Sequence, residues 1–450
     1  MKRRLLIWVA VLAVSLVLIG VAGCGQGTST GEGAKQEGAG QGSVEQGGAK
    51  TGGAEPIVFG APVGLGSQEG RNSLQAVELA VEEINARGGI SVGGTKRPIK
   101  LVSIDDRGAE PGIPVHDSLA AVEKLIVENK PNAIVAGIFR SEVLLAGMDL
   151  IAKYKIPFIT TMPMTPQFEK KLQTDREKYK YLFRASVNSL HHAGYILKGL
   201  EFIGKEFGFN KIYIMHEDLL WATAASDAIE KWAKDNGWEV VGRDAYPSGS
   251  SDFSSSLTKA KSGQAQVIAV TFDMPQTGIL IKQVKTMQIP AVTIGYVSPA
   301  TAENAWDVFG EDIEGLINLV PEIGPIPIQA VPKSVEFNKN FGIKYGEEAR
   351  RKMVGHSPGP SYDSVYIMAD AIERAGSLDP DAIVTALEQT DMEGVVGRIK
   401  FNEDHQVPYG FDPKETAIGA LFQWQSGKRV PVFPEAISEG KIALPSYMQK

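Results

Sequence analysis

The stretch PIVFGAPVGLGSQEGRNSLQAVELAVEEINARGGI, residues 56–90, decides the fold class. Residues 57–59 have the apolar character of a short buried strand, and residues 60–70 form a glycine-spaced turn. Beyond the turn, Leu74, Val77, Val81 and Ile84 recur at helical spacing, which predicts an amphipathic helix. Gly88 and Gly89 end this helix, because glycine adopts the left-handed C-terminal conformation at low cost. Such a strand–loop–helix unit presents free backbone N–H groups to a ligand at the helix N-terminus.

The glycines of this turn have two alternative interpretations. Gly64, Gly66 and Gly70 resemble a dinucleotide-binding fingerprint, with Asp105 or Asp106 in position to bind a ribose. The spacing argues against it, because the third glycine falls one residue late and Asp105 lies 105 − 70 = 35 residues further on, where about 20 is expected. The second interpretation is a plain strand–helix unit with a glycine turn.

Strands and helices continue to alternate along the rest of the chain, in two successive series. This pattern predicts an α/β fold with parallel sheets covered by helices, divided between two lobes. Ligands bind to such lobes at the carboxyl ends of the strands, in the crevice between them. The further strands are expected at 99–104, 133–139, 157–161 and 181–186 in the first series, at 211–216, 238–246, 267–272 and 291–297 in the second, and at 418–425 near the C-terminus.

Composition excludes several functional classes. A net charge of −7 argues against a nucleic-acid partner, which would need a basic surface. The 450 residues contain one cysteine, so no intramolecular disulfide can form. No G-x-S-x-G, H-E-x-x-H or Walker motif occurs. The adjacent His191 and His192 point in different directions on a helix, which disfavours a shared metal ion. We therefore expect no enzyme activity, no cofactor and no metal site.

The N-terminus is expected to direct export. Lys2, Arg3 and Arg4 precede an apolar run over residues 5–19, which ends at Val-Ala-Gly-Cys. This pattern predicts a signal peptide over residues 1–23, and the run is short for a membrane span, which takes about 20 apolar residues. The last four residues resemble a bacterial lipobox, which implies that Cys24 carries a lipid and anchors the protein to the membrane.

Residues 24–55 are rich in glycine and have almost no large apolar side chain. They cannot offset the entropy of ordering, so we expect a disordered tether. A random coil of this length spans roughly 30 Å on average.

The order of these features resembles one family. A strand with G-x-P-x-G-x-G, the helix ELAVEEINARGGI and a second strand ending at Asp105 and Asp106 are typical of type I solute-binding proteins of branched-chain amino acid (leucine/isoleucine/valine) ABC transporters. A late segment with Gly394, Gly397 and Phe401 and a final strand with Phe-Gln-Trp, residues 422–424, also recur there. The resemblance extends over about residues 56–430.

This resemblance implies two Rossmann-like lobes joined by a three-stranded hinge, the type I periplasmic binding protein fold. It assigns residues 56–186 and 298–400 to the first lobe, and 187–297 and 401–450 to the second. The hinges are expected near Ser186, Tyr296 and Phe401, where the lobes would close around a ligand.

The resemblance also implies ligand contacts. The serine that binds the ligand carboxylate corresponds to Ser141, which is alternatively the N-cap of the next helix. A threonine contact corresponds to Met164, where Thr160, Thr161 and Thr165 are close enough to substitute. The aromatic residue that covers the ligand corresponds to Trp221, alternatively a core residue.

The glutamate that binds the ligand ammonium corresponds to Gln276, which has no charge to offer. Asp273 or Glu69 is then expected to supply the anion, unless the ligand lacks an ammonium group. Arg140 lies beside Ser141 in sequence, and we expect Arg140 or Glu69 to recognise a polar group that branched-chain amino acids lack. The alternative is that Arg140 and Glu69 are loop charges exposed to solvent and do not contact a ligand.

These features together predict a lipid-anchored, extracytoplasmic binding protein. Its partners are a small-molecule ligand, an amino acid or related carboxylate or amide, and an ABC permease in the membrane. A sensory module that presents its liganded form to a membrane receptor is the alternative, as is a binder of a small carboxylate that is not an amino acid. An extracellular α/β enzyme would need a nucleophile–base pair or metal cluster, which the sequence does not show.

Overall fold

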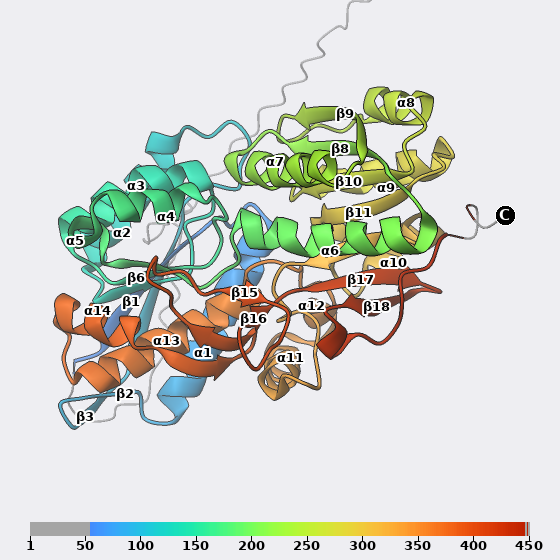
Figure 1. Ribbon diagram of the computed structural model, residues 1–450. Coiled ribbons are helices and arrows are strands. Elements are labelled where there is room, and N and C mark those ends of the chain that lie inside the picture. The colour runs from blue at the N-terminus through green and yellow to red at the C-terminus, as the bar shows by residue number, and fades with distance from the viewer. Residues whose placement is uncertain (1–54, 446–447, 449–450) are drawn as a thin grey trace, which may run out of the picture. The chain divides into compact units, whose positions relative to one another are not determined.

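The computed structural model describes residues 55–445 and 448 of this protein. Its first sheet has five parallel strands in the order β4-β1-β5-β6-β7 (Figure 1). Short apolar segments form the central strands, and their burial matches a sheet covered on both faces. The strands are β1 (Ile57–Val63), β4 (Ile99–Asp105), β5 (Ala133–Val135), β6 (Phe158–Thr160) and β7 (Leu182–Arg184).

The turn between β1 and the first helix, α1 (Gln68–Ala86), places α1 against the first sheet. Ser67 caps the helix by accepting a hydrogen bond from the N–H of Gly70 at 2.9 Å. A side chain at Gly70 would bring its Cβ within 2.0 Å of the carbonyl oxygen of Gly64, so only glycine lets the turn close this tightly. The strand extends to Val63, four residues beyond the predicted end, and the turn is correspondingly shorter.

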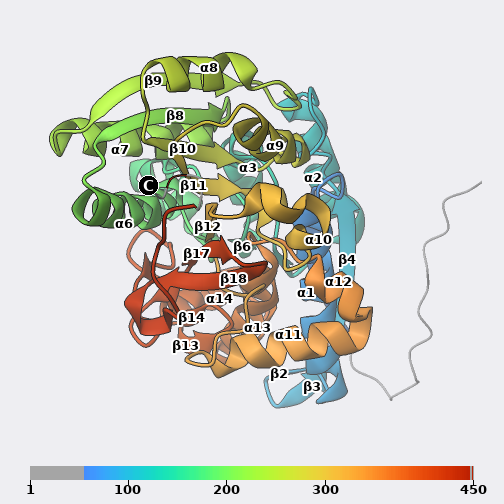
Figure 2. The ribbon, with the colours of Figure 1, turned by 90° about the vertical axis from the view of Figure 1, so that its right-hand side faces the viewer.

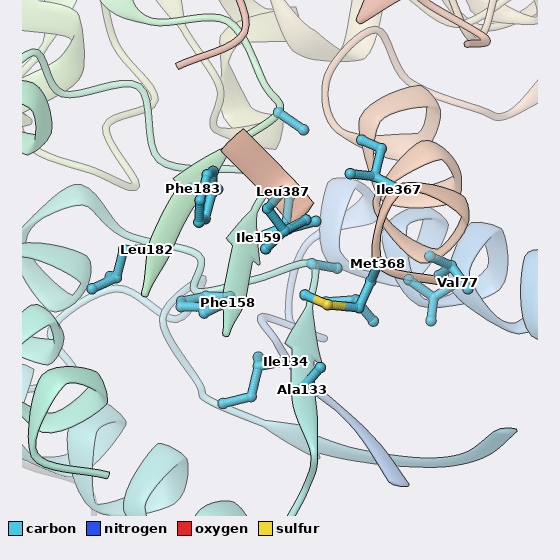
Figure 3. Packing of buried hydrophobic residues seen from close by; sticks show 14 of the residues in the cluster. Val77, Ala133, Ile134, Phe158, Ile159, Leu182, Phe183, Ile367, Met368 and Leu387 are labelled. Atoms are coloured by element: carbon cyan, nitrogen blue, oxygen red, sulfur yellow. The ribbon is translucent and has the colours of Figure 1, made fainter. Parts of the chain in front are cut away.

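The helices of the first lobe come from both ends of the folded chain. The late helix α13 packs against α1, and Met368 and Ile367 of α13 lie beside Val77 in one core (Figure 3). Figure 3 also shows Phe158 and Ile159 of the sheet in this core. The helices are α2 (Val115–Asn129), α3 (Ser141–Tyr154), α4 (Gln167–Thr174), α5 (Arg176–Tyr179), α11 (Pro332–Tyr345), α12 (Glu347–Arg351), α13 (Pro358–Ala375) and α14 (Pro380–Glu388).

The second sheet has seven strands in the order β18-β17-β12-β11-β10-β8-β9, which follow one another from bottom to top of Figure 2. β8 to β12 are parallel, and β17 and β18 are antiparallel to their neighbours. The strands are β8 (Lys211–Glu217), β9 (Glu239–Tyr246), β10 (Val267–Phe272), β11 (Val292–Val297), β12 (Ile317–Val320), β17 (Ala420–Gln425) and β18 (Lys428–Phe433). The helices are α6 (Ser189–Phe207), α7 (Leu220–Asp235), α8 (Ser254–Ser262), α9 (Gly278–Thr286) and α10 (Ala305–Phe309), with short 3-10 turns η1 (Pro275–Thr277), η2 (Ser298–Ala300), η3 (Gly310–Ile313) and η4 (Glu435–Ile437).

Two small sheets complete the fold. β2 and β3 form a hairpin, and four short strands lie in the order β13-β14-β16-β15. Tyr409 and Ala417 of the second group belong to the core of the first lobe. The strands are β2 (Ile90–Val92), β3 (Thr95–Arg97), β13 (Asp391–Gly394), β14 (Gly397–Lys400), β15 (Tyr409–Gly410) and β16 (Ala417–Ile418).

The chain passes between the two large sheets three times, and two passages differ from the predicted hinges. The first, between β7 and α6, includes Ser186 as expected. The second follows β12, because β12 pairs with β11, so the chain does not leave the second lobe near Tyr296 or at the predicted boundary 297/298. The third lies near Gly419, because Phe401 packs in the first-lobe core at 4.9 Å from Phe183. The sequence did not predict β12, because four residues are too few to show a periodic pattern.

The predicted signal peptide, most of the tether and Cys24 lie outside the described residues. Within the described part of the chain, no helix is long and apolar enough to cross a membrane.

Candidate ligand-binding cavity

A cavity lies where the carboxyl ends of strands from both sheets meet. Parallel α/β sheets place their ligand sites at such edges. Its walls are formed by Glu69, Phe139, Arg140, Ser141, Glu142, Met162, Pro163, Met164, Leu219, Trp221, Asp273, Tyr296 and His356.

The start of α3 forms one wall in the first lobe. Arg140 is the N-cap and Ser141 is the first helical residue, so Ser141 does not cap the helix as the alternative interpretation proposed. The Ser141 hydroxyl is buried, with 2% of the residue exposed, and has no hydrogen-bond partner. Arg140 donates from Nη2 to the carbonyl of Ile113 at 2.8 Å, and its buried Nε has no partner. Both side chains can therefore donate to a bound anion.

The loop after β6 forms the next wall and is fixed by a buried cation. Arg184, which is fully buried, donates to the carbonyls of Pro163 at 3.2 Å and Thr165 at 2.8 Å. Its guanidinium also pairs with Glu169. Because several oxygens compensate the buried charge, the loop that carries Met164 has a defined position.

Aromatic side chains form the wall of the second lobe. Trp221 is the second residue of α7, and its ring centroid lies 6.1 Å from that of Tyr296 in an edge-to-face arrangement. His192 packs against both rings, at 5.7 and 5.6 Å. Burial lowers the pKa of His192 to about 3, so the imidazole is neutral. The indole N–H of Trp221 is buried without a partner and is available to an acceptor in the cavity.

Two carboxyl groups face the cavity near this wall. Glu69 follows the Ser67 cap of α1 and accepts a hydrogen bond from the Ser298 hydroxyl of the second lobe. Burial raises the pKa of Glu69 above its ordinary value, although Ser298 acts in the opposite direction. Asp273 follows β10, and its pKa is raised well above the ordinary range by burial, then by Glu217 and Glu69.

A buried ion pair supports the cavity from the hinge side. His356 contacts the Glu322 carboxylate through Nδ1 at 2.9 Å and the carbonyl of Met162 through Nε2 at 2.7 Å. Both neighbours accept hydrogen bonds, so both ring nitrogens donate and His356 is an imidazolium. Burial lowers the pKa of His356, but Glu322 and the Met162 carbonyl outweigh this effect and raise it.

Hydrogen bonds join the lobes across the cavity. The Glu142 carboxylate of α3 accepts from the N–H of Leu220, at the start of α7, at 3.3 Å. The Ser298 to Glu69 bond is a second connection. These contacts close the cavity on two sides, which is the arrangement of lobes closed around a ligand.

The structure brings six of the eight predicted site residues together on the cavity walls: Glu69, Arg140, Ser141, Met164, Trp221 and Asp273. Thr161 does not line the cavity, because its hydroxyl is buried against the Ser361 hydroxyl at 2.8 Å. Gln276 also lies off the walls, in the 3-10 turn η1 beyond Asp273. The roles of all eight residues as ligand contacts remain predictions.

Sequence reasoning missed several wall residues. Tyr296 was expected only as a hinge, although its position at the end of a strand was a usable signal. His356 precedes a helix and follows no strand, so no local pattern marked it. Within the described residues, no group of His, Cys, Asp and Glu side chains could hold a metal ion.

The periplasmic binding protein family matches residues 60–412, and the chain belongs to this family. Leu/Ile/Val-binding protein homolog 7 of Brucella suis biovar 1 is 27% identical over 399 residues, which cover 86% of this chain and 92% of that protein.

Solved structures show the same fold. The branched-chain amino acid transporter substrate binding protein LivJ of Streptococcus pneumoniae, in complex with isoleucine, superposes with a TM-score of 0.68 at 21% identity, covering 84% of this chain and all of that one. A solute-binding protein of an ABC transporter from R. palustris, in complex with benzoate, has a TM-score of 0.67 at 16% identity, with coverages of 86% and 99%. The predicted type I fold with two lobes is thereby confirmed.

Membership in this family establishes the general function. The chain is a solute-binding protein of the ABC-transporter type, not an enzyme, and it works outside the cytoplasm. Its partners are a small-molecule ligand and a membrane permease.

Proposed function

We propose that this protein captures an amino acid between its lobes and delivers it to an ABC permease. The observation that carries this proposal is the distribution of polar groups around one cavity. Unpartnered donors, the Ser141 hydroxyl and Arg140 Nε, lie on the first-lobe wall, and the carboxyl groups of Glu69 and Asp273 lie near the second-lobe wall. A carboxylate and an ammonium on the same small molecule complement these two walls.

The apolar walls favour a ligand with a hydrophobic side chain. Phe139, Met162, Met164, Leu219 and the ring of Trp221 line the remaining space. Burial of an aliphatic side chain against them contributes roughly 1.5–3 kcal/mol. The leucine-, isoleucine- and valine-binding relatives support the same ligand class.

A thermal-shift panel of the standard L-amino acids, with benzoate and 4-methylpentanoate, tests this proposal on the folded part of the chain. A ligand at about 100 times its dissociation constant adds roughly 2.7 kcal/mol to stability. We expect at least one apolar amino acid to raise the melting temperature. If only benzoate and 4-methylpentanoate, the two acids without an amine, raise the melting temperature, the ligand is a small carboxylate and not an amino acid.

The second part of the proposal concerns the membrane. We propose that cleavage of residues 1–23 leaves Cys24 as a lipidated N-terminus, with residues 24–55 as a tether. The support is the charged and apolar N-terminal sequence followed by Val-Ala-Gly-Cys.

Metabolic labelling with a radioactive fatty acid tests the anchor in a bacterial host. Wild-type protein is expected to be labelled and to sediment with membranes, whereas Cys24→Ser is expected to lose the label. Unchanged labelling of the Cys24→Ser protein would contradict the assignment.

A further inference from the structure

Two adjacent carboxyl groups stand at the end of β4, and neither lines the cavity. Asp105 is the last residue of the strand, and Asp106 follows it. Asp105 accepts hydrogen bonds through Oδ1 from the N–H of Leu65 at 3.1 Å and from the N–H of Arg107 at 2.8 Å. Asp105 therefore holds its own loop and the turn after β1. Asp106 is fully buried and acts on a different loop.

Both carboxylate oxygens of Asp106 accept hydrogen bonds from the backbone. Oδ1 accepts from the N–H of Gly108 at 2.8 Å, and Oδ2 accepts from the N–H of Phe139 at 2.9 Å. Because β1 lies between β4 and β5 in the sheet, the second bond joins loops that are two strands apart. Burial raises the pKa of Asp106, and the N–H groups of Phe139 and Gly108 act in the opposite direction. These donors compensate the buried carboxylate and fix both loops.

The loop that Asp106 holds carries donors of the cavity wall. β5 ends at Val135 and α3 begins at Ser141, so residues 136–140 form this loop. Phe139, Arg140 and Ser141 all line the cavity. The Ser141 hydroxyl and Arg140 Nε are buried and have no hydrogen-bond partner. A shift of the Phe139 N–H moves both donors, because they follow it within two residues of chain.

Close packing around Phe139 acts together with the hydrogen bond. A Cβ at Gly64 would lie 2.9 Å from the Cβ of Phe139, and a Cβ at Gly108 would lie 3.0 Å from it. Carbon atoms pack at about 3.5–4.0 Å, so only glycine at these two positions lets the three loops meet. The position of Phe139 is therefore determined by Asp106 on one side and by two glycines around it.

We propose that Asp106 is a positioning residue for ligand capture, which holds residues 136–140 so that Arg140 and Ser141 present their unpartnered donors to the carboxylate of a ligand. This proposal rests on the proposed amino-acid function and adds a residue that does not touch the ligand. Placement matters because a hydrogen bond weakens once its heavy atoms are more than about 3.2 Å apart or its angle is poor.

Asp106→Asn tests the proposal. An amide has one acceptor oxygen, so one of the two N–H groups loses its partner while the side-chain volume is kept. The probes are L-leucine and L-leucinamide, in which a carboxamide replaces the carboxylate. We expect the wild-type protein to bind L-leucine roughly 10- to 100-fold more tightly than the amide, and the variant to keep a preference of about threefold or less. Isothermal titration calorimetry measures the four affinities.

Asp363→Asn is the matched control. Asp363 is also buried, and its two oxygens accept from the N–H of Val395 at 2.9 Å and from the N–H of Val396 at 3.3 Å. None of these residues lines the cavity. We expect this variant to lower the melting temperature, as Asp106→Asn does, and to keep the wild-type preference for L-leucine.

Three results of the calorimetry would overturn the positioning role of Asp106 and leave the proposed function standing. The first is a loss of the preference in both variants, and the second is its retention in both. The third is equal affinity of the wild-type protein for the two probes.

Gly108→Ala shifts the loop without removing the carboxylate, since its Cβ would press on Phe139. If Asp106→Asn does not fold, this variant decides: a reduced preference for L-leucine supports the positioning role, and an unchanged preference contradicts it. If the wild-type protein binds neither probe, hydrogen exchange of the unliganded protein takes the place of calorimetry, and the thermal-shift panel alone decides the proposed function. Faster exchange of residues 137–144 in Asp106→Asn than in Asp363→Asn supports the role of Asp106, and equal exchange overturns it.

Discussion

Replacement of Glu322 by alanine is expected to lower the free energy of unfolding by about 3–5 kcal/mol, because it leaves a buried cation without its partner. Glu322 is fully buried where the chain leaves β12 for the first lobe. It accepts from His356 Nδ1 at 2.9 Å, from the N–H of Val187 at 3.0 Å and from the N–H of Ser357 at 3.2 Å. The variant loses all three bonds, which join two passages between the lobes. Urea denaturation of the unliganded protein measures the change.

Glu348→Ala provides the control for this experiment. Glu348 pairs with Lys352 one helical turn away, and its side chain is 84% exposed. Exposed pairs of this kind contribute about 0.5 kcal/mol or less. Equal losses of stability in Glu322→Ala and Glu348→Ala would show that the buried ion pair does not stabilise the fold.

The same ion pair predicts a pH dependence. The pKa of His356 in the folded protein is raised above its unfolded value by Glu322 and the Met162 carbonyl, against the effect of burial. The stability that His356 contributes is therefore fully present below about pH 6.5 and is lost as the pH rises through the raised value. In Glu322→Gln the carboxylate is absent, so this part of the pH dependence should disappear.

Replacement of Trp221 by alanine is expected to weaken amino-acid binding by about 2–4 kcal/mol, roughly 30- to 1000-fold. Trp221 forms the second-lobe wall with Tyr296 and provides an unpartnered indole N–H. The variant loses the apolar contact, the donor and the exclusion of water from the polar groups of the ligand. Calorimetric titration with the amino acid identified in the thermal-shift panel measures the loss.

Trp232→Ala separates this effect from a general loss of stability. Trp232 lies on the same helix, packs against Trp238 at 5.7 Å and does not line the cavity. It is expected to lower the melting temperature without weakening ligand binding by more than a factor of about two. Equal loss of affinity in both variants would place the ligand away from Trp221.

Much of the cavity wall was predictable from the sequence, because the residues at the ligand-binding edge of α/β lobes follow strands. Asp273 comes directly after an apolar segment, Ser141 follows one after Arg140, and Glu69 lies in the first turn of α1, the helix after β1. Any side chain at such a position lies at the carboxyl edge of its sheet, whatever the rest of the fold. Trp221 needed the family resemblance in addition, because a tryptophan at a helix start is equally typical of a core.

Position along the chain did not determine which way a side chain points. Thr161 also follows a strand, but its hydroxyl bonds to Ser361 of α13 instead of facing the cavity. Gln276 was assigned by analogy with the family, and a 3-10 turn moves it off the wall. The orientation of Thr161 depends on α13, which is distant in sequence. The position of Gln276 depends on a local turn that has no periodic signal in the sequence.

Local periodicity was enough to establish the α/β class, the two series of strands and the helix after β1, because burial of one face of each element imposes a repeat that can be read residue by residue. Only the tertiary structure shows that β12 joins the second sheet and that His356 contacts Glu322 beside the cavity. These contacts connect segments far apart in the chain, and their free energy comes from burial and charge pairing that exist only once both lobes have packed.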